Sequence, residues 1–432
     1  MNIPHITDKY YITYGIFYLL GILTFIPNYF IITASTYWLF KFRYVGIRSP
    51  VTDPDIFPGP PTERNTLQAS FVATYYIITQ LSLIVFIVLT AAYSKKLPPP
   101  EKRITAALLC SLVFYIVNLI FVNIVTDTFQ IAFFLIVMCI ACFLGICGAV
   151  IIVSLFEMVS NFPSEYYSAI LTAQALCGVI SAIIQIITIS LSSDSPMLGG
   201  FIFFGIGTAM VCVTLSIYTY SKKNSQYFIY HVGNDPMEHT VQPSRRFLVR
   251  MWTKAKHPLK NTRIYMISLV IVSGTTAIMY PGVMSLVVAE LSDGISDNKW
   301  AEFYFVPVVT FLVANLCDLI GRHLATKIKQ PNHEWVVLAI AILRIGFIPL
   351  LTYCNVQPRF HIPVLFYDVP YVMFTILFMF SNGYLINLCI VTVPTSAQNG
   401  EEKSLITVMT VLSGVFSTAM CSFLSLMFVH IV

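Results

Sequence analysis

The chain has 432 residues, of which 57% are apolar and only 10% are charged. A soluble globular domain carries about 25% charged residues, so this composition excludes an ordinary soluble protein and predicts a membrane protein. The net charge is only +5, and the basic residues flank apolar runs without lining a soluble face. That distribution argues against nucleic acid as a partner and makes the lipid bilayer the expected one.

A helix that crosses the bilayer needs about 20 apolar residues, and eleven runs of the sequence are long enough. The first run continues well beyond the core of a signal peptide, which is about 7–15 residues long, so we expect a retained helix. The predicted spans are residues 11–40, 67–93, 104–125, 131–160, 167–191, 200–220, 264–290, 303–328, 335–354, 369–393 and 404–432.

The basic residues predict the orientation of the chain. With the N-terminus inside, the inner segments hold 17 Lys and Arg residues and the outer segments hold 6. Cytoplasmic loops of membrane proteins carry such an excess of basic residues. We therefore expect the N-terminus inside and the C-terminus outside.

Two long loops interrupt the spans: a Pro-rich outer loop over 41–66 and a polar, basic inner loop over 221–263. The inner loop divides the chain into an N-terminal six-helix half (1–220) and a C-terminal five-helix half (264–432). Two packed halves that rock around a site at the middle of the membrane are typical of transporters.

One predicted span, 303–328, contains an acid and a base. Asp318 and Arg322 are four residues apart, so a helix places them on one face, one turn apart. A charge that faces hydrocarbon costs about 2.5 kcal/mol or more, so such residues usually face a bundle interior or a watery cavity. Arg344, about ten residues into the next span, is a second candidate partner for Asp318.

The sequence shows no sign of a cofactor. Its ten cysteines lie inside or at the edge of apolar runs, and no His, Cys and carboxylate cluster has the spacing of metal ligands. We therefore expect no metal, no cofactor and no enzyme active site.

Short motifs along the chain are similar to those of one membrane protein family. In the first half they include Pro27, Thr33-Ala34, Ser154-Leu155-Phe156, Gln174 and Gly178, and in the second half Tyr280-Pro281, Phe305-Val306-Pro307, Asn315-x-x-Asp318-x-x-Gly321-Arg322, Arg344-x-x-Phe347-x-Pro349 and Phe380-Ser381-Asn382-Gly383-Tyr384-Leu385. With these motifs the chain resembles the equilibrative nucleoside transporter family over most of its length. The resemblance implies an eleven-helix bundle of the major-facilitator type that carries nucleosides such as adenosine and uridine down their gradient, with the plasma membrane as the default location.

The resemblance also implies where the substrate binds. Asp318 and Arg322 would hold the ribose hydroxyls, Asn315 lies one turn before Asp318 on the same face, and Tyr280 would form the cavity wall or an outer gate. The other substrate positions that it implies are Asn28, Ile32, Gly148, Ile152, Gln174 and Phe311.

At the end of the site that would face the base, the sequence departs from the family pattern. Asn28 stands where animal members of the family have Trp, and Ile152 stands where they often have a glutamine that reaches the base. Isoleucine cannot form a hydrogen bond with a purine edge. We therefore expect an altered base preference, with Asn28 as a compensating group.

Two alternatives remain open at this point. A proton-coupled nucleoside or nucleobase carrier would use Asp318, Glu157 or His323 as its proton site. A membrane-embedded enzyme would need a nucleophile or metal motif, and the sequence contains none that we recognise.

Overall fold

The computed structural model describes residues 8, 11–43, 64–159, 162–192, 195–233, 262–290, 299–328, 330–331, 333–359, 365, 367–393 and 400–431. Within these residues, eleven helices are long and apolar enough to cross a membrane, which confirms the predicted number of spans. The same residues contain no β-sheet, only isolated bridges such as the one between Val287 and Val356. The chain is an integral, multi-pass, all-α membrane protein.

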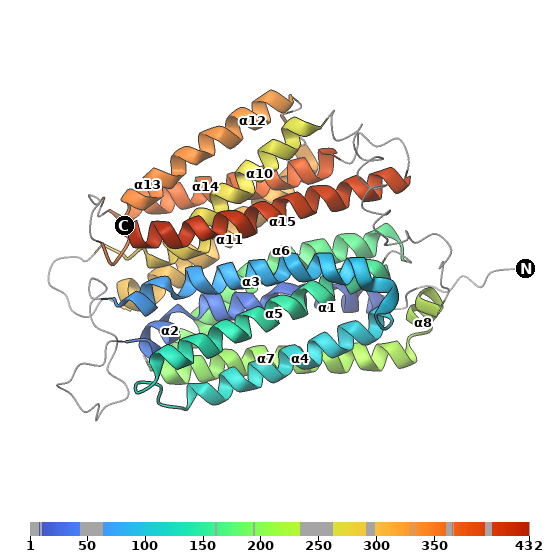
Figure 1. The fold of residues 1–432 in the computed structure, drawn as a ribbon, viewed down its shortest axis with the longest axis horizontal. Coiled ribbons are helices and arrows are strands. Elements are labelled where there is room, and N and C mark those ends of the chain that lie inside the picture. Colours follow the sequence, from blue (N-terminus) through green and yellow to red (C-terminus); the bar gives the residue numbers. More distant parts are fainter. Residues whose placement is uncertain are drawn as a thin grey trace, which may run out of the picture.

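The helices gather into two groups, and the first is drawn from blue to green in Figure 1. Its elements are α1 (Ile12–Thr33), α2 (Ser35–Lys41), α3 (Thr66–Tyr93), η3 (Ser94–Lys96), α4 (Pro100–Val122), α5 (Gln130–Val159), α6 (Ser164–Leu191), α7 (Pro196–Asn224) and α8 (Gln226–Gly233). Within this group α1 packs along α6, α3 along α5, and α4 along both α5 and α7.

The second group is drawn from yellow to red (Figure 1). Its elements are α10 (Arg263–Ile278), η4 (Met279–Val283), η5 (Met284–Leu286), η6 (Trp300–Tyr304), η7 (Val306–Val313), α11 (Ala314–Ile328), α12 (Glu334–Leu343), η8 (Arg344–Gly346), α13 (Phe347–Tyr353), α14 (Asp368–Thr392) and α15 (Gly400–Ile431). Here α11 packs along α14, and α10 packs against α12, α14 and α15. The two groups meet where α6 contacts η7 and α11, and where α3 contacts η4 and α15.

The first predicted span is two helices, because the chain bends at Ala34 (φ −70°, ψ 46°) between α1 and α2. Side chains satisfy carbonyl groups next to the bend. Thr33 donates to the Tyr29 carbonyl at 2.8 Å, and the Trp38 indole donates to the Ile31 carbonyl at 2.7 Å. Lipid offers no hydrogen bonds, so a break inside a span needs such internal donors.

Irregular backbone is concentrated in the second group. The seventh span leaves helical geometry at Tyr280 (φ −108°, ψ 134°), as a residue before a proline tends to do. The eighth span begins as the π-helical turns η6 and η7, and the ninth tightens at Arg344. Non-helical backbone at membrane depth is tolerated where protein buries it or where it lines a cavity. These breaks therefore indicate that a substrate site, if present, lies beside the second group.

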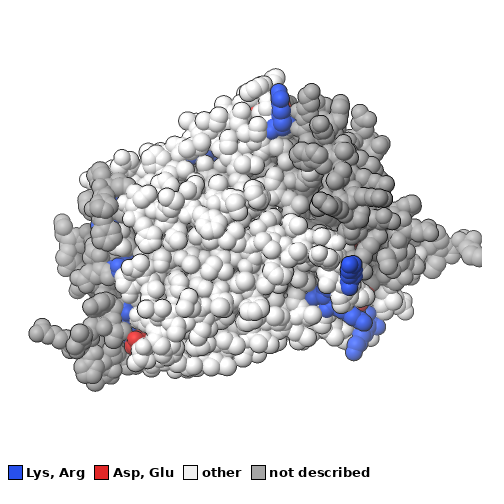
Figure 2. All heavy atoms as spheres, in the orientation of Figure 1, with Lys and Arg blue, Asp and Glu red and all other residues white. Residues whose placement is uncertain are grey.

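The predicted inner loop starts later than its composition suggested. The sixth span, α7, runs to Asn224, and α8 follows at once. The ring of Phe228 in α8 packs against the rings of Phe17 and Phe162, with centroids 6.3 and 6.0 Å apart. The rest of the predicted loop, 234–261, lies outside the described residues. On the face drawn in Figure 2, most coloured charged residues lie toward the two ends of the molecule, and uncharged residues cover the broad middle.

The tightest helix contact described is the crossing of α11 and α14. A Cβ added to Gly383 would stand 1.9 Å from the Asp318 carbonyl oxygen, and one added to Gly321 would stand 2.3 Å from the Phe380 carbonyl oxygen. Each glycine thus lets the backbone of the other helix approach. Small residues allow this close packing in membrane bundles, and here it brings α14 against the turn that carries Asp318.

We predict that Gly383→Ala destabilises the protein, because the added methyl group meets backbone that cannot rotate away. Overpacking costs about 1–3 kcal/mol, and this contact belongs at the upper end of that range. The measurement is the melting temperature of the purified protein in detergent. Gly205→Ala on α7 is the matched control, since a Cβ there meets nothing within 4 Å. Equal melting temperatures for the two variants would contradict the described crossing.

Candidate functional site

The predicted acid–base pair is present on α11. Arg322 donates through Nε to Asp318 Oδ2 at 2.7 Å, which confirms that the two side chains lie on one face. Their side chains are 35% and 14% exposed, so neither is sealed inside the bundle. The one hydrogen bond that the Arg322 guanidinium forms among the described residues is through Nε, which leaves its two terminal nitrogens available to donate to a substrate.

The second oxygen of Asp318 is held by another helix. Asn382 of α14 donates from Nδ2 to Asp318 Oδ1 at 2.6 Å, and Thr276 of α10 lies 2.6 Å from Asn382 Oδ1. The alternative partner from the sequence, Arg344, does not form an ion pair with Asp318; it contacts Thr276 at 3.1 Å instead. The pair is therefore part of a polar cluster that spans three helices of the second group.

Tyrosines of both groups lie near enough to the ion pair to interact with its charges. The hydroxyl of Tyr29 on α1 interacts electrostatically with Asp318, Arg322 and Tyr76 of α3. Tyr280 of η4 interacts in turn with Tyr29, Tyr76 and Asp318. Since Tyr29 belongs to the first group, the ion pair lies on the side of α11 that faces that group. Neither Tyr29 nor Tyr76 was predicted from the sequence, although Tyr29 directly follows Asn28, which was.

One helical turn before Asp318, Asn315 contacts both Tyr280 and Phe311. Asn315 donates from Nδ2 to Tyr280 Oη at 2.8 Å and to the Phe311 carbonyl at 2.7 Å. The rings of Tyr280 and Phe311 meet edge to face at 6.3 Å. Across the interface, a Cβ on Gly178 of α6 would stand 2.2 Å from Asn315 Oδ1. The two groups are thus in close contact one helical turn from Asp318.

Gln174 lies one turn before Gly178 on α6, as Asp318 lies one turn after Asn315 on α11. Because α6 and α11 are neighbours with Gly178 against Asn315, this places Gln174 on the face of α6 that approaches the ion pair. The Nε2 atom of Gln174 is buried, and no described residue accepts a hydrogen bond from it. A buried donor without an acceptor is rare and calls for a partner.

The remaining predicted residues lie in the first group, and none of them has a described contact with Asp318. Asn28 accepts a hydrogen bond from Tyr75 Oη at 3.0 Å, and Ile32, one turn later, is buried. A Cβ on Gly148 would meet the Thr24 carbonyl oxygen at 3.2 Å, so this glycine lets α5 pack on α1. Ile152, one turn after Gly148, is half-buried.

Of the three residues considered as proton sites, Asp318 belongs to this cluster, whereas Glu157 and His323 have no described contact with it. Glu157 forms an ion pair with Arg103 between α5 and α4. His323 follows Arg322 on α11, and its side chain is exposed. Neither is in a described contact with Asp318. In the described residues no group of three or more His, Cys, Asp and Glu residues could hold a metal ion.

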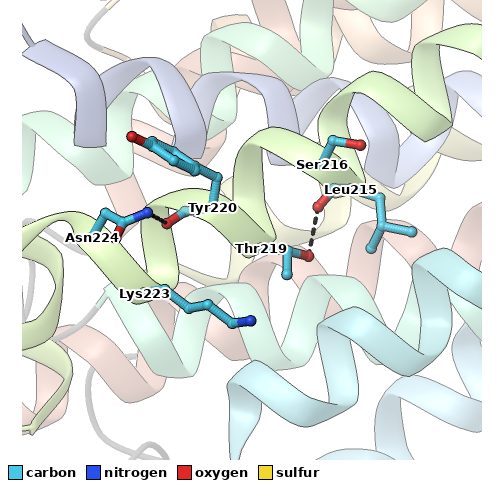
Figure 3. Close-up of a pocket in the computed structure, with 6 residues that line it drawn as sticks. All are labelled: Leu215, Ser216, Thr219, Tyr220, Lys223 and Asn224. Atoms are coloured by element: carbon cyan, nitrogen blue, oxygen red, sulfur yellow. Dashed lines mark hydrogen bonds between the residues drawn. The ribbon is translucent and has the colours of Figure 1, made fainter.

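A surface groove on α7 is not part of the site (Figure 3). Its lining comes from one helix, and its hydrogen bonds, from Thr219 to the Leu215 carbonyl and from Asn224 to the Tyr220 carbonyl, stay within that helix. No predicted substrate residue belongs to it. The residues that line it are Leu215, Ser216, Thr219, Tyr220, Lys223 and Asn224.

Hydrogen bonds link the two groups at one end of the bundle. Arg64, just before α3, donates to the carbonyls of Leu286 and Gln357 at 3.4 Å each, and Ser190 lies 3.0 Å from Tyr304 Oη. Burial lowers the pKa of the Arg64 guanidinium to about 10, which leaves it charged at neutral pH. We refer to these contacts as the Arg64 latch.

Eleven membrane helices in two groups, with a partly exposed ion pair on the side of one group that faces the other, are typical of a membrane transporter. Comparisons with known proteins are consistent with this class. A family model described as "Nucleoside transporter" matches residues 138–428, so the chain belongs to the nucleoside transporter family.

Individual relatives and a solved structure cover most of the chain. Human equilibrative nucleoside transporter 1 is 26% identical over 430 residues, which cover 92% of each chain. Human equilibrative nucleoside transporter 2 is also 26% identical, with the same coverage. The crystal structure of the nucleoside transporter NupG matches 97% of this chain and 96% of its own with a TM-score of 0.54 at 10% sequence identity, which supports the major-facilitator-like fold.

We predict that Gly178→Ala weakens the contact between the groups, because the new methyl group displaces Asn315 from Tyr280. Stability in detergent should fall by about 1–3 kcal/mol. Removing the obstructing amide as well, in Gly178→Ala with Asn315→Ala, should recover part of that loss, which a double-mutant cycle of melting measurements detects. Gly15→Ala on α1 serves as the control, since its Cβ meets nothing within 4 Å. Losses that simply add in the double variant would show that the two positions do not touch.

Proposed function

We propose that this chain carries nucleosides across a membrane down their concentration gradient, by alternating access. The observation that carries the proposal is the ion pair of Asp318 and Arg322, which is partly exposed and close enough to Tyr29 of the other helix group to interact with it. Membership of the nucleoside transporter family and the printed names of its relatives support nucleosides as the substrate class. We further propose adenosine and uridine as substrates and the plasma membrane as the location.

The chemistry of the ion pair suits a ribose. Hydroxyl groups can both donate and accept, and the pair offers a carboxylate that accepts and a guanidinium with two terminal nitrogens that donate. Hydrogen bonds to charged groups are about twice as strong as neutral ones. The opposite charges also balance each other, so a neutral substrate can enter without leaving an isolated charge.

The first helix group supplies the other side of the proposed cavity. The buried Gln174 amide, which has no described acceptor, is available to donate to the substrate, and the rings of Tyr29 and Tyr76 offer faces on which a base can stack. A substrate held in this way touches both groups. Its binding therefore couples their relative movement, as alternating access requires.

The Arg64 latch supports a state closed at one end. Arg64 and Ser190 join the groups there, and the contact of Gly178 with Asn315 lies between that end and the ion pair. The excess of basic residues favours the N-terminus inside, so we propose that the latch closes the outer end. On the same grounds we propose residues 1–220 and 264–432 as the two moving halves, joined by the inner loop 221–263.

We predict that the purified protein in proteoliposomes takes up labelled adenosine and uridine until the inner and outer concentrations are equal. Asp318→Asn and Arg322→Ala should each lower the initial rate about tenfold or more, the effect of losing a hydrogen bond to a charged group. Asp127→Asn, which removes an acid paired with Arg43 between α4 and α5, is the control and should retain the wild-type rate.

Two outcomes of this experiment would contradict the proposal. Accumulation above the outer concentration under an imposed pH gradient would indicate a proton-coupled carrier. Loss of uptake in Asp127→Asn to the same extent as in Asp318→Asn would show that the rate reports general damage and not the site.

We propose that Ile152, which cannot form a hydrogen bond with a base, sets a base preference unlike that of a relative with glutamine there. The variant Ile152→Gln should change the ratio of adenosine to uridine uptake about three- to tenfold, the range of one neutral hydrogen bond. Ile152→Leu keeps the position apolar and should leave the ratio unchanged. If the ratio in Ile152→Gln equals the wild-type ratio, this position does not read the base.

A further inference from the structure

Arg344 is the largest of the fully buried side chains, with 1% of its surface exposed. It stands in η8, where the ninth span tightens between α12 and α13. A buried cation needs partners that replace its lost hydration. The ion pairs among the described residues all involve other side chains, so neutral groups hold this charge.

Several of these partners brace the helices around Arg344. It donates to the Val272 carbonyl of α10 at 3.1 Å and to the Phe378 carbonyl and Ser381 hydroxyl of α14 at 2.9 Å each. Its guanidinium also lies 4.5 Å from the centre of the Phe378 ring. These contacts explain how Arg344 holds α10, η8 and α14 together. A further hydrogen bond of Arg344 connects it to the ion pair.

That partner is Thr276. Arg344 Nη2 lies 3.1 Å from Thr276 Oγ1, which lies 2.6 Å from Asn382 Oδ1, and Asn382 Nδ2 lies 2.6 Å from Asp318 Oδ1. The opposite oxygen of Asp318 accepts from Arg322. A continuous chain of hydrogen bonds therefore joins the buried guanidinium of Arg344 to the carboxylate at the site.

The chemistry of the two ends fixes the direction of every bond in this chain. Arginine can only donate, so Thr276 accepts from Arg344, and its single proton faces two acceptors, Asn382 Oδ1 at 2.6 Å and the Val272 carbonyl at 2.9 Å. The Asp318 carboxylate, paired with Arg322, can only accept, so the amide of Asn382 must turn its NH₂ group toward Asp318 and its oxygen toward Thr276. With Asn382 Oδ1 only 2.6 Å away, the Thr276 proton belongs in that shorter contact, since turning it to Val272 would leave two acceptors facing each other. In this arrangement each bond supports the next.

We propose that Arg344 is a positioning residue for substrate recognition, which acts through Thr276 and Asn382 to fix the orientation of the Asp318 carboxylate. The inference rests on the proposed function. With one oxygen held by Arg322 and the other by Asn382, the carboxylate cannot rotate, and its unused lone pairs have fixed directions. A fixed acceptor discriminates between nucleosides that carry ribose hydroxyls and those that lack them, because binding energy then depends on geometry.

The chain offers a closely matched pair of variants for the test. Thr276→Val removes the hydroxyl that links Arg344 to Asn382 and keeps the shape of the side chain. Thr275→Val removes a hydroxyl that is also near Arg344, at 3.4 Å, but that has no described contact with Asn382. Thr276→Ser restores the hydroxyl at the linking position, and Thr276→Ala removes it in a smaller side chain should the valine variant fail to fold.

The measurement is uptake into proteoliposomes of uridine and of 2′,3′-dideoxyuridine, with KM and Vmax determined for each. In Thr276→Val we expect the KM for uridine to rise about five- to tenfold with little change in Vmax, and the preference for uridine over the dideoxy analogue to shrink. Thr276→Ser should recover both values, and Thr275→Val should resemble the wild type.

The outcomes separate this inference from the proposed function. Suppose that the wild type transports uridine, and that Thr276→Val does not differ from Thr275→Val in its KM for uridine or in its preference for uridine over the dideoxy analogue. Arg344 then only braces helices, and the inference is wrong. A fall in Vmax at unchanged KM in Thr276→Val would overturn it in the same way. If the wild type transports no nucleoside, the proposed function itself has failed.

Discussion

The structure of the second helix group depends on one constraint: three charged side chains lie inside an apolar bundle, so their partners must come from the bundle itself. Asp318, Arg322 and Arg344 meet this constraint through hydrogen bonds from three helices. The carbonyl groups that Arg344 uses, those of Val272 and Phe378, belong to helices that approach it closely. The glycines at the crossing of α11 and α14 bring α14 against the turn that carries Asp318, where Asn382 holds the carboxylate.

The first helix group differs in where its charged residues lie. Its described ion pairs, such as Arg103 with Glu157 and Arg43 with Asp127, lie near helix ends. Toward the centre it presents aromatic and amide groups, Tyr29, Tyr76 and Gln174, which need far less compensation than a charge. The proposed cavity therefore has a charged wall on one side and an aromatic wall on the other, which matches a molecule with a sugar and a base.

Much of the fold could be predicted from sequence, because apolar length and helical spacing are local properties. The eleven spans and the pairing of Asp318 with Arg322 follow directly from them. The bend at Ala34 was not predictable in this way, since alanine favours helices and the bend depends on donors from Thr33 and Trp38.

The site was predictable only where one helix carries it. Asn28 and Tyr29 are adjacent in sequence, and the rotation of α1 against α3 decides that Asn28 meets Tyr75 while Tyr29 approaches the ion pair. No pattern within α1 reveals that rotation. The same holds for Arg344, whose partner could not be chosen from sequence because Thr276 and Asn382 come from separate helices.

The division of charge between the groups has a consequence for the transport cycle. The charged cluster is complete within the second group, so it can move as a unit without separating any ion from its partner. Among the described residues, the hydrogen bonds that break when the groups separate at the Arg64 latch join Arg64 to two neutral carbonyls and the Ser190 hydroxyl to that of Tyr304. Breaking these contacts exposes groups that water can satisfy, whereas breaking Asp318 from Arg322 would leave two uncompensated charges. The placement of the ion pair within one helix thus keeps the energetic cost of alternation low.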